Sequence, residues 1–354
     1  MRTATRSRGP GRAAAAVGLC LVAAACSGGK KKEAATTTTG PPPSTTTAPA
    51  LPADADPLTG LPDPSGAVPA RPALIVKIDN APKARPQAGI NDADVVVEEG
   101  VEGGVTRFFT LFQSKDAPAV GPVRSARSTD LLVARQLGTP LFAYSGANAV
   151  FEGLIAKAPL INVGVSRVPT AYHREPGREV PYNLWSDTRS LFARAGDDKT
   201  PPPPLFAYRA PGEAPPEVGS EPAPRVQAQW KLNITTTVVF AWDEATKTFK
   251  KTTDGVPHLD AAGTQVAPEN VIFQVVGYHD TGLRDRSGAV VPEAELIGQG
   301  DAWVLTGGRL IKGHWSRPTD AQTTAYTTGS GEPIRLTPGH TWVELVPTGN
   351  LSAL

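Results

Sequence analysis

Two arginines three positions apart are the strongest candidates for a chemical role in this sequence. Arg124 and Arg127 lie in segment 121–127, GPVRSAR, directly before a predicted helix that starts near Ser128. A guanidinium group binds phosphate or carboxylate through paired hydrogen bonds, and a helix N-terminus adds partial positive charge. Arg107, preceded by EGGVT, could join them. The pattern predicts an anion-binding pocket built from Arg107, Arg124, Ser125 and Arg127.

Nearby carboxylates give these arginines an alternative, structural role. Four acidic residues lie close enough in the sequence to form ion pairs with them: Glu98, Glu99, Glu102 and Asp130. Arginines paired in this way would be neutralised, and no pocket would need to exist beside them. The residue types alone leave both alternatives open.

The same carboxylates are candidates for catalysis. Arginines can stabilise the negative charge that develops in a transition state, and a carboxylate within hydrogen-bond reach can act as general base. The candidate bases for such an envelope hydrolase or phosphoryl transferase are Glu98, Glu102 and Asp79. Strand alternation would place Glu98 and Glu99 on opposite faces, which weakens any joint role. A solvated loop around Gly103 is the simpler interpretation.

Most other chemistries lack the residues that they need. The chain contains no HExxH, CxxC or P-loop pattern, and its five histidines are scattered without ligand spacing. We therefore expect no metal site and no cofactor. The chain has 35 basic and 34 acidic side chains, whereas nucleic-acid binding requires a basic excess that displaces counterions. We expect no nucleic-acid partner.

The N-terminus has the pattern of an exported lipoprotein. Four arginines and no acid precede an apolar run of thirteen residues, 13–25. This length suits the core of a signal peptide and is too short to span a bilayer, so residues 1–25 are predicted to be a signal peptide. Segment 21–29, LVAAACSGG, resembles a bacterial lipobox, in which the cysteine, here Cys26, is acylated and becomes the new N-terminus. Plain secretion with cleavage near Ala25 is the alternative.

Acylation of Cys26, by palmitate or similar chains, would anchor the protein to the outer face of the cell membrane. Buried acyl chains contribute about 0.8 kcal/mol per methylene, so two or three of them hold a protein stably. The residues that follow Cys26, as far as 57, are dominated by Thr, Pro, Ala and Gly. They are predicted to form a disordered tether with a reach of roughly 30 Å.

Ordered patterning begins near Leu58 and predicts an α/β domain over 58–198. Apolar and β-branched runs predict strands at 73–79, 94–98, 105–113 and 141–144. Helix signals lie between and after them, at 128–138, at 147–157 and after Ser186. Strands that alternate with helices are typical of α/β domains. The Pro-rich segment 199–228 is predicted to connect this domain to the next.

The second domain, 229–350, is predicted to be mostly β. It contains a series of short runs of β-branched and aromatic residues, and Gly307-Gly308 is typical of a hairpin turn. Five tryptophans are interpreted as core and hairpin packing: Trp230, Trp242, Trp303, Trp315 and Trp342. The predicted fold class is therefore α+β, with an N-terminal α/β domain followed by a mostly β domain that forms a sandwich or a small barrel.

Several motifs together resemble the YerB-like bacterial lipoproteins. They are RP at 71–72, IVKIDN at 75–80, KARPQAG at 83–89, ADVVVE at 93–98, VEGGVTRF at 101–108, GPVRSAR at 121–127, PYNL at 181–184 and LTPGHTWVE at 336–344. The resemblance covers nearly all of the chain after residue 57. It implies a cell-surface lipoprotein with this domain pair, and it implies no reaction because both domains of that family are of unknown function.

These observations favour a non-enzymatic surface lipoprotein whose α/β domain binds an anionic envelope ligand. A wall fragment, a lipid-linked phosphate or a protein carboxylate would each fit an arginine cluster. An envelope hydrolase or phosphoryl transferase is the second alternative, and a scaffold for another membrane protein is the third. An enzyme needs a carboxylate that converges with the arginines in a cleft, a binding protein needs only the basic pocket, and a scaffold is compatible with a flat, fully paired arginine set.

Overall fold

A computed structural model describes residues 51–354 except 232 and 286–287. The predicted signal peptide, Cys26 and most of the predicted tether lie outside the described residues. Packed chain begins slightly before the predicted domain start, because Ala55 and Asp56 are already buried. Of the helices that the structure describes, none is both long enough and apolar enough to cross a membrane.

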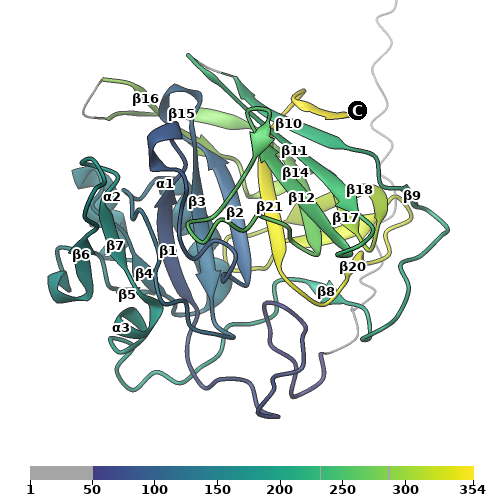
Figure 1. The fold of residues 1–354 in the computed structure, drawn as a ribbon, viewed down its shortest axis with the longest axis horizontal. Coiled ribbons are helices and arrows are strands. Elements are labelled where there is room, and N and C mark those ends of the chain that lie inside the picture. The colour runs from purple at the N-terminus through teal and green to yellow at the C-terminus, as the bar shows by residue number, and fades with distance from the viewer. Residues whose placement is uncertain (1–50, 232, 286–287) are drawn as a thin grey trace, which may run out of the picture. The chain divides into compact units, whose positions relative to one another are not determined.

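Strands dominate the described chain and its helices are short (Figure 1). The strands of the N-terminal half are β1 (Leu74–Asp79), β2 (Val95–Gly100), β3 (Thr106–Phe112), β4 (Leu141–Ala143), β5 (Ile161–Asn162), β6 (Tyr172–Arg174) and β7 (Leu184–Ser186). The later strands are β8 (Ala207–Tyr208), β9 (Glu221–Pro222), β10 (Val226–Lys231), β11 (Thr235–Asp243), β12 (Thr248–Thr253), β13 (Val256–Pro257), β14 (Asn270–Val276), β15 (Tyr278–Arg284), β16 (Val290–Ala294), β17 (Gly298–Thr306), β18 (Arg309–Arg317), β19 (Ala325–Thr328), β20 (Arg335–Leu336), β21 (Thr341–Pro347) and β22 (Leu351–Ala353). The helices are α1 (Ser128–Ala134), α2 (Ala149–Ile155) and α3 (Thr188–Phe192), with short 3-10 helices η1 (Pro82–Ala84), η2 (Glu102–Gly104), η3 (Arg135–Leu137) and η4 (Pro169–Ala171).

One large sheet runs through both halves of the chain. Its strand order is β19-β18-β17-β14-β21-β2-β3-β1-β4-β5, with β9 paired to β18. The join is made by β21, which lies parallel both to β14 and to β2 and places Val343 opposite Val97. The predicted strands near 73–79, 94–98, 105–113 and 141–144 are confirmed as β1 to β4. Their incorporation into a single sheet with C-terminal strands was not predicted.

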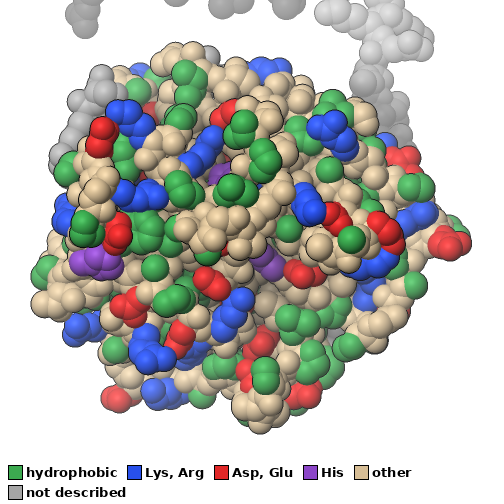
Figure 2. Space-filling model, viewed as in Figure 1, with side chains coloured by type: hydrophobic (Ala, Val, Ile, Leu, Met, Phe, Trp, Pro, Cys, Tyr) green, Lys and Arg blue, Asp and Glu red, His purple; other side chains and the backbone are tan. Residues whose placement is uncertain are grey.

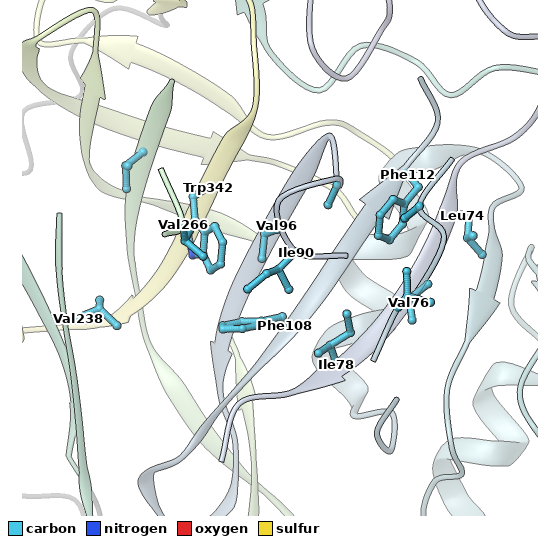
Figure 3. Packing of buried hydrophobic residues seen from close by; sticks show 14 of the residues in the cluster. Leu74, Val76, Ile78, Ile90, Val96, Phe108, Phe112, Val238, Val266 and Trp342 are labelled. Carbon is cyan, nitrogen blue, oxygen red and sulfur yellow. The ribbon is translucent and has the colours of Figure 1, made fainter. Parts of the chain in front are cut away.

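A second sheet, β13-β12-β11-β10-β22, packs on one face of the large sheet. Alternation along β1 sends Leu74, Val76 and Ile78 into this shared core (Figure 3). Phe108 and Trp342 meet there edge to face, with ring centroids 5.2 Å apart. Both sheets are open, so of the two predicted arrangements the structure adopts the sandwich. The α+β class, with most helix in the first half, is confirmed.

The opposite face of the large sheet carries a second core. Ile75, Phe109 and Phe142 pack there with Val133 from α1. The segment predicted as a connector belongs to this packing: Tyr208 is buried, and its hydroxyl donates to the carbonyl of Leu58. Strands β8 and β9 lie inside that segment and pair with β20 and β18, so it is not a free linker.

The hairpin predicted at Gly307-Gly308 joins β17 to β18, and both glycines have positive φ, as such a turn requires. Three of the five C-terminal tryptophans are buried, which confirms their packing role: Trp230, Trp315 and Trp342. On the face seen in Figure 2, basic and acidic side chains are interspersed and no broad field of one sign covers the surface. A strong anion site on this face would have to arise from a local concentration of charge.

Candidate functional site

A cavity of about 480 Å³ lies beside the GPVRSAR segment. Its walls include all four residues predicted for the anion pocket: Arg107, Arg124, Ser125 and Arg127. Volumes of about 300–1,000 Å³ are typical of small-ligand sites. The cavity is thus large enough for an organic ligand and brings the predicted residues together.

The large sheet places Arg107 at its rim. Arg107 is near the start of β3, where its register partners are Asp79 at the end of β1 and Glu99 near the end of β2. Residues directly opposite on neighbouring strands share a face, so this row carries one cation between two carboxylates. The cavity therefore opens where the ends of three strands meet.

Segment 121–127 is held between β1 and the residues that follow β4. The Arg124 N–H donates to the Lys77 carbonyl at 2.8 Å, and the Ser145 N–H donates to the Arg124 carbonyl at 3.0 Å. The Arg124 side chain, about a quarter exposed, places its Nε 2.6 Å from Oδ2 of Asp79. Since that ion pair uses Nε, the two terminal nitrogens of the guanidinium are left to face other groups.

Arg127 is held by Glu102. Its Nε and Nη2 donate to the two carboxylate oxygens, the second at 2.9 Å, and both side chains are buried. A bidentate pair of this kind fixes the guanidinium plane. The structural pairing considered from sequence is therefore found for Arg127 with Glu102, whereas Arg124 pairs with Asp79, which was not among the partners considered.

The helix predicted to start near Ser128 is found as α1. Arg127, not Ser128, is the N-cap residue of α1, and its N–H donates to the Asp130 carboxylate at 2.6 Å. Ser128 is the first helical residue and does not line the cavity. With only seven residues in α1 and the carboxylate of Asp130 at its first turn, the helix dipole cannot be counted as part of the site.

Arg107 is the least neutralised of the three arginines. Its Nη1 donates to the Ser125 carbonyl at 2.8 Å, while its Nη2 is 4.0 Å from Glu102, beyond hydrogen-bond distance. Its Nε is buried and finds no hydrogen-bond partner among the described residues. Burial, followed by the positive charge of Arg127, lowers the pKa of Arg107 to about 10. An anion in the cavity would offset both the burial of the Arg107 charge and its repulsion by Arg127.

Two further arginines line the cavity and were missed by sequence reasoning. Arg174 on β6 donates to the side-chain oxygen of Asn183 at 2.8 Å, and Arg284 at the end of β15 pairs with Asp280 at 3.1 Å. Neither belongs to a recognisable motif. Each reaches the cavity only because a short hairpin packs against the rest of the fold. The five lining arginines share the wall with two carboxylates, those of Glu102 and Asp285.

Glu98 is not at the site, which corrects its prediction as a general base. It is fully buried on the opposite face of β2, where Lys251 lies 2.5 Å from one oxygen and Asn80 and Thr106 donate to the other. Glu99 points the other way, as alternation predicts, and pairs with buried Lys77. The acidic run is therefore not a solvated loop. Burial raises the pKa of Glu99 to about 7.

Comparisons with known proteins agree with the sequence motifs. Residues 58–201 match the family described as protein of unknown function (DUF3048) N-terminal domain, and residues 226–343 match the corresponding C-terminal domain. The chain is 27% identical over 311 residues to "Putative lipoprotein YerB" of Bacillus subtilis (strain 168), which covers 82% of this chain and 86% of that protein. Its fold resembles the crystal structure of YerB protein from Bacillus subtilis, with a TM-score of 0.71 and 24% identity over 84% of this chain and 99% of that one. The predicted resemblance to YerB-like proteins is confirmed.

Proposed function

This chain belongs to the two-domain DUF3048 family, and from that premise and the geometry of its cavity we propose that it is a lipid-anchored envelope protein that binds an anionic ligand. One observation carries the proposal. Among the described residues, buried Arg107 has no carboxylate within hydrogen-bond distance, and it lines a cavity with four more arginines. Buried charges are normally paired, and an anion in the cavity would supply a partner.

The anchor in this proposal is Cys26, acylated after removal of residues 1–25. The lipobox-like segment 21–29 supports it, as does similarity to a protein whose name describes a lipoprotein. The protein would then be exported and held at the outer face of the cell membrane. Its ligand would be met in the envelope, outside the cytoplasm.

Binding would use donors that are already in position. Arg107 would donate from Nη2, Arg124 from its terminal nitrogens, and Ser125 from its hydroxyl, while Glu102 and Asp79 hold Arg127 and Arg124 in place. Preorganised donors in a partly dehydrated cavity lose little conformational entropy on binding. Hydrogen bonds to charged groups contribute about 1.5–3 kcal/mol each, so losing one should weaken binding about tenfold or more.

The two alternative functions fit this geometry less well. Of the three bases predicted for a hydrolase or phosphoryl transferase, Glu98 is in the core, and both Asp79 and Glu102 are held by arginines. A scaffold would be consistent with a flat and fully paired arginine set, whereas Arg107 is incompletely paired and lines a cavity. Binding without reaction is the function that the site supports best.

Calorimetric titration of the full chain carrying Cys26→Ser tests the proposal, with inorganic phosphate and acetate as probes at constant ionic strength. We expect phosphate to bind, and we expect Arg107→Gln to weaken its binding about tenfold or more. The double variant Arg124→Gln with Asp79→Asn removes a donor without leaving an unpaired buried carboxylate. Arg189→Gln, on a side chain that is 86% exposed, is the matched control. Absence of binding by both probes, or equal binding by folded Arg107→Gln protein, would overturn the proposal.

A further inference from the structure

The cavity is chemically divided according to the elements that line it. The buried arginines come from β3 and from segment 121–127. Most of the apolar lining comes from other elements: Phe151 on α2, Val165 after β5, Val180 and Leu184 around the start of β7, and Val291 on β16, with Val123 from segment 121–127 itself. The cavity therefore combines buried guanidinium groups with a hydrocarbon surface.

The apolar residues reach from the interior to the surface. Phe151, Leu184 and Val291 are buried, whereas Val180 is 74% exposed. Arg174, which also lines the cavity, is exposed as well. The buried guanidinium groups therefore lie in the same cavity as an apolar lining that extends to an exposed valine.

We propose that the ligand is an amphiphile, a phosphate group bonded to an apolar chain, of the kind that a membrane lipid presents. This inference rests on the proposed anion-binding function and goes beyond it by naming what the rest of the ligand must be. The phosphate contacts Arg107 and Arg124, and the chain lies against Phe151, Leu184 and Val180.

Other anions match this lining less well. An inorganic anion would leave the apolar side chains in contact with water, so their hydrophobic surface would contribute nothing to binding. A phosphorylated sugar presents hydroxyl groups along its whole length, and the apolar side chains offer no hydrogen-bond partners for them. In a ligand with a hydrocarbon chain next to the phosphate, the phosphate contacts the arginines and the chain packs against the apolar side chains. The anchor proposed above would keep such ligands within reach.

The inference predicts that affinity rises with chain length. Burial of one methylene is expected to tighten binding about fourfold, until the chain extends past Val180 into water. Titrations of the full chain carrying Cys26→Ser would compare inorganic phosphate with butyl, hexyl and octyl phosphate, each below its micelle concentration. Val180→Ser should reduce the gain in affinity with chain length. Val218→Ser is the matched control, because Val218 is 93% exposed and does not line the cavity.

The outcomes separate this inference from the proposed function. Inorganic phosphate binding with no gain over the alkyl series would refute the amphiphile and leave the anion site standing. Failure of every probe to bind would overturn both. A gain with length that Val180→Ser and Val218→Ser reduce equally would place the alkyl chain outside this cavity and also refute the inference.

Discussion

The replacement of Lys251 by methionine offers a quantitative test of how the two sheets are held together. Lys251, on β12 of the small sheet, is fully buried, and its ammonium lies 2.5 Å from Glu98 of β2 and 2.6 Å from Glu344 of β21. The rings of Trp342 and Phe240 lie 4.3 and 4.7 Å away. Methionine would keep the apolar contacts and remove only the charge that these carboxylates share.

The expected loss of stability follows from the carboxylates that Lys251→Met would leave buried without a cation. Removing one partner of a buried ion pair costs about 3–5 kcal/mol, because the other charge stays buried without compensation. For about 300 folded residues that corresponds to a fall in melting temperature of about 5–8 °C. Burial raises the pKa of Glu344 well above its ordinary range, and the charge of Glu98 adds to this effect. Proton uptake by Glu344 should therefore make the loss smaller at pH 5 than at pH 8.

Urea and thermal unfolding, followed by tryptophan fluorescence at both pH values, would measure the effect. Lys312→Met is a matched control, because Lys312 also pairs with a glutamate, Glu221, and lies over a tryptophan ring, yet its side chain is 52% exposed. An exposed pair is worth about 0–1 kcal/mol. If both variants lose the same stability, or if the loss at Lys251 is independent of pH, the reasoning about the buried cluster is refuted.

Two further predictions concern a carboxyl group and two glycines. Because burial raises the pKa of Glu99 from 4.5 to about 7, its contribution to stability is fully present below pH 4.5 and is lost as the pH rises through 7. Glu99→Gln should remove that decline, and unfolding free energies at pH 5 and pH 8 that fall as in the wild type would contradict this. Gly313→Ala should destabilise, since its added carbon would lie 2.0 Å from the Thr327 carbonyl oxygen, whereas Gly153→Ala, in α2 with no atom within 4 Å, should stabilise by about 0.5–1 kcal/mol. Similar melting temperatures for these two variants would refute the packing argument.

Features of the fold that depend on local sequence patterns could be predicted from the sequence. A continuous apolar run such as 73–79 can be satisfied only by burial, and β1 is buried along its whole length. The arginines of segment 121–127 were predicted to converge because they are close in sequence, and both line the cavity with Arg107. Strand alternation also predicted correctly that Glu98 and Glu99 would face opposite ways.

Long-range pairing could not be predicted in the same way. The apolar residues of β21 would suit any buried strand, and nothing local indicates that Val343 lies between β14 and β2. Lys251, the partner of Glu98, is 153 residues away in the sequence. Arg174 and Arg284 reach the cavity only through the placement of two short hairpins. Each of these features depends on tertiary contacts for which one sequence carries no periodic signal.

The shared sheet gives a physical reason for expecting the anion site to need both halves of the chain. Thr236 on β11 donates to the Gly104 carbonyl at 2.9 Å and so helps to hold the turn that carries Glu102. Tyr278 accepts from the Gly100 N–H at 3.0 Å and donates to the Leu345 carbonyl at 2.9 Å, which ties β15 to β2 and β21. A chain ending before β10 would lose these contacts, along with Arg284 and Val291 from the cavity wall. Glu102 would then be free to move, and Arg127 would lose the partner that orients it. The proposed binding function is therefore a property of the domain pair, although the two buried arginines of the cavity, Arg107 and Arg127, belong to the first domain.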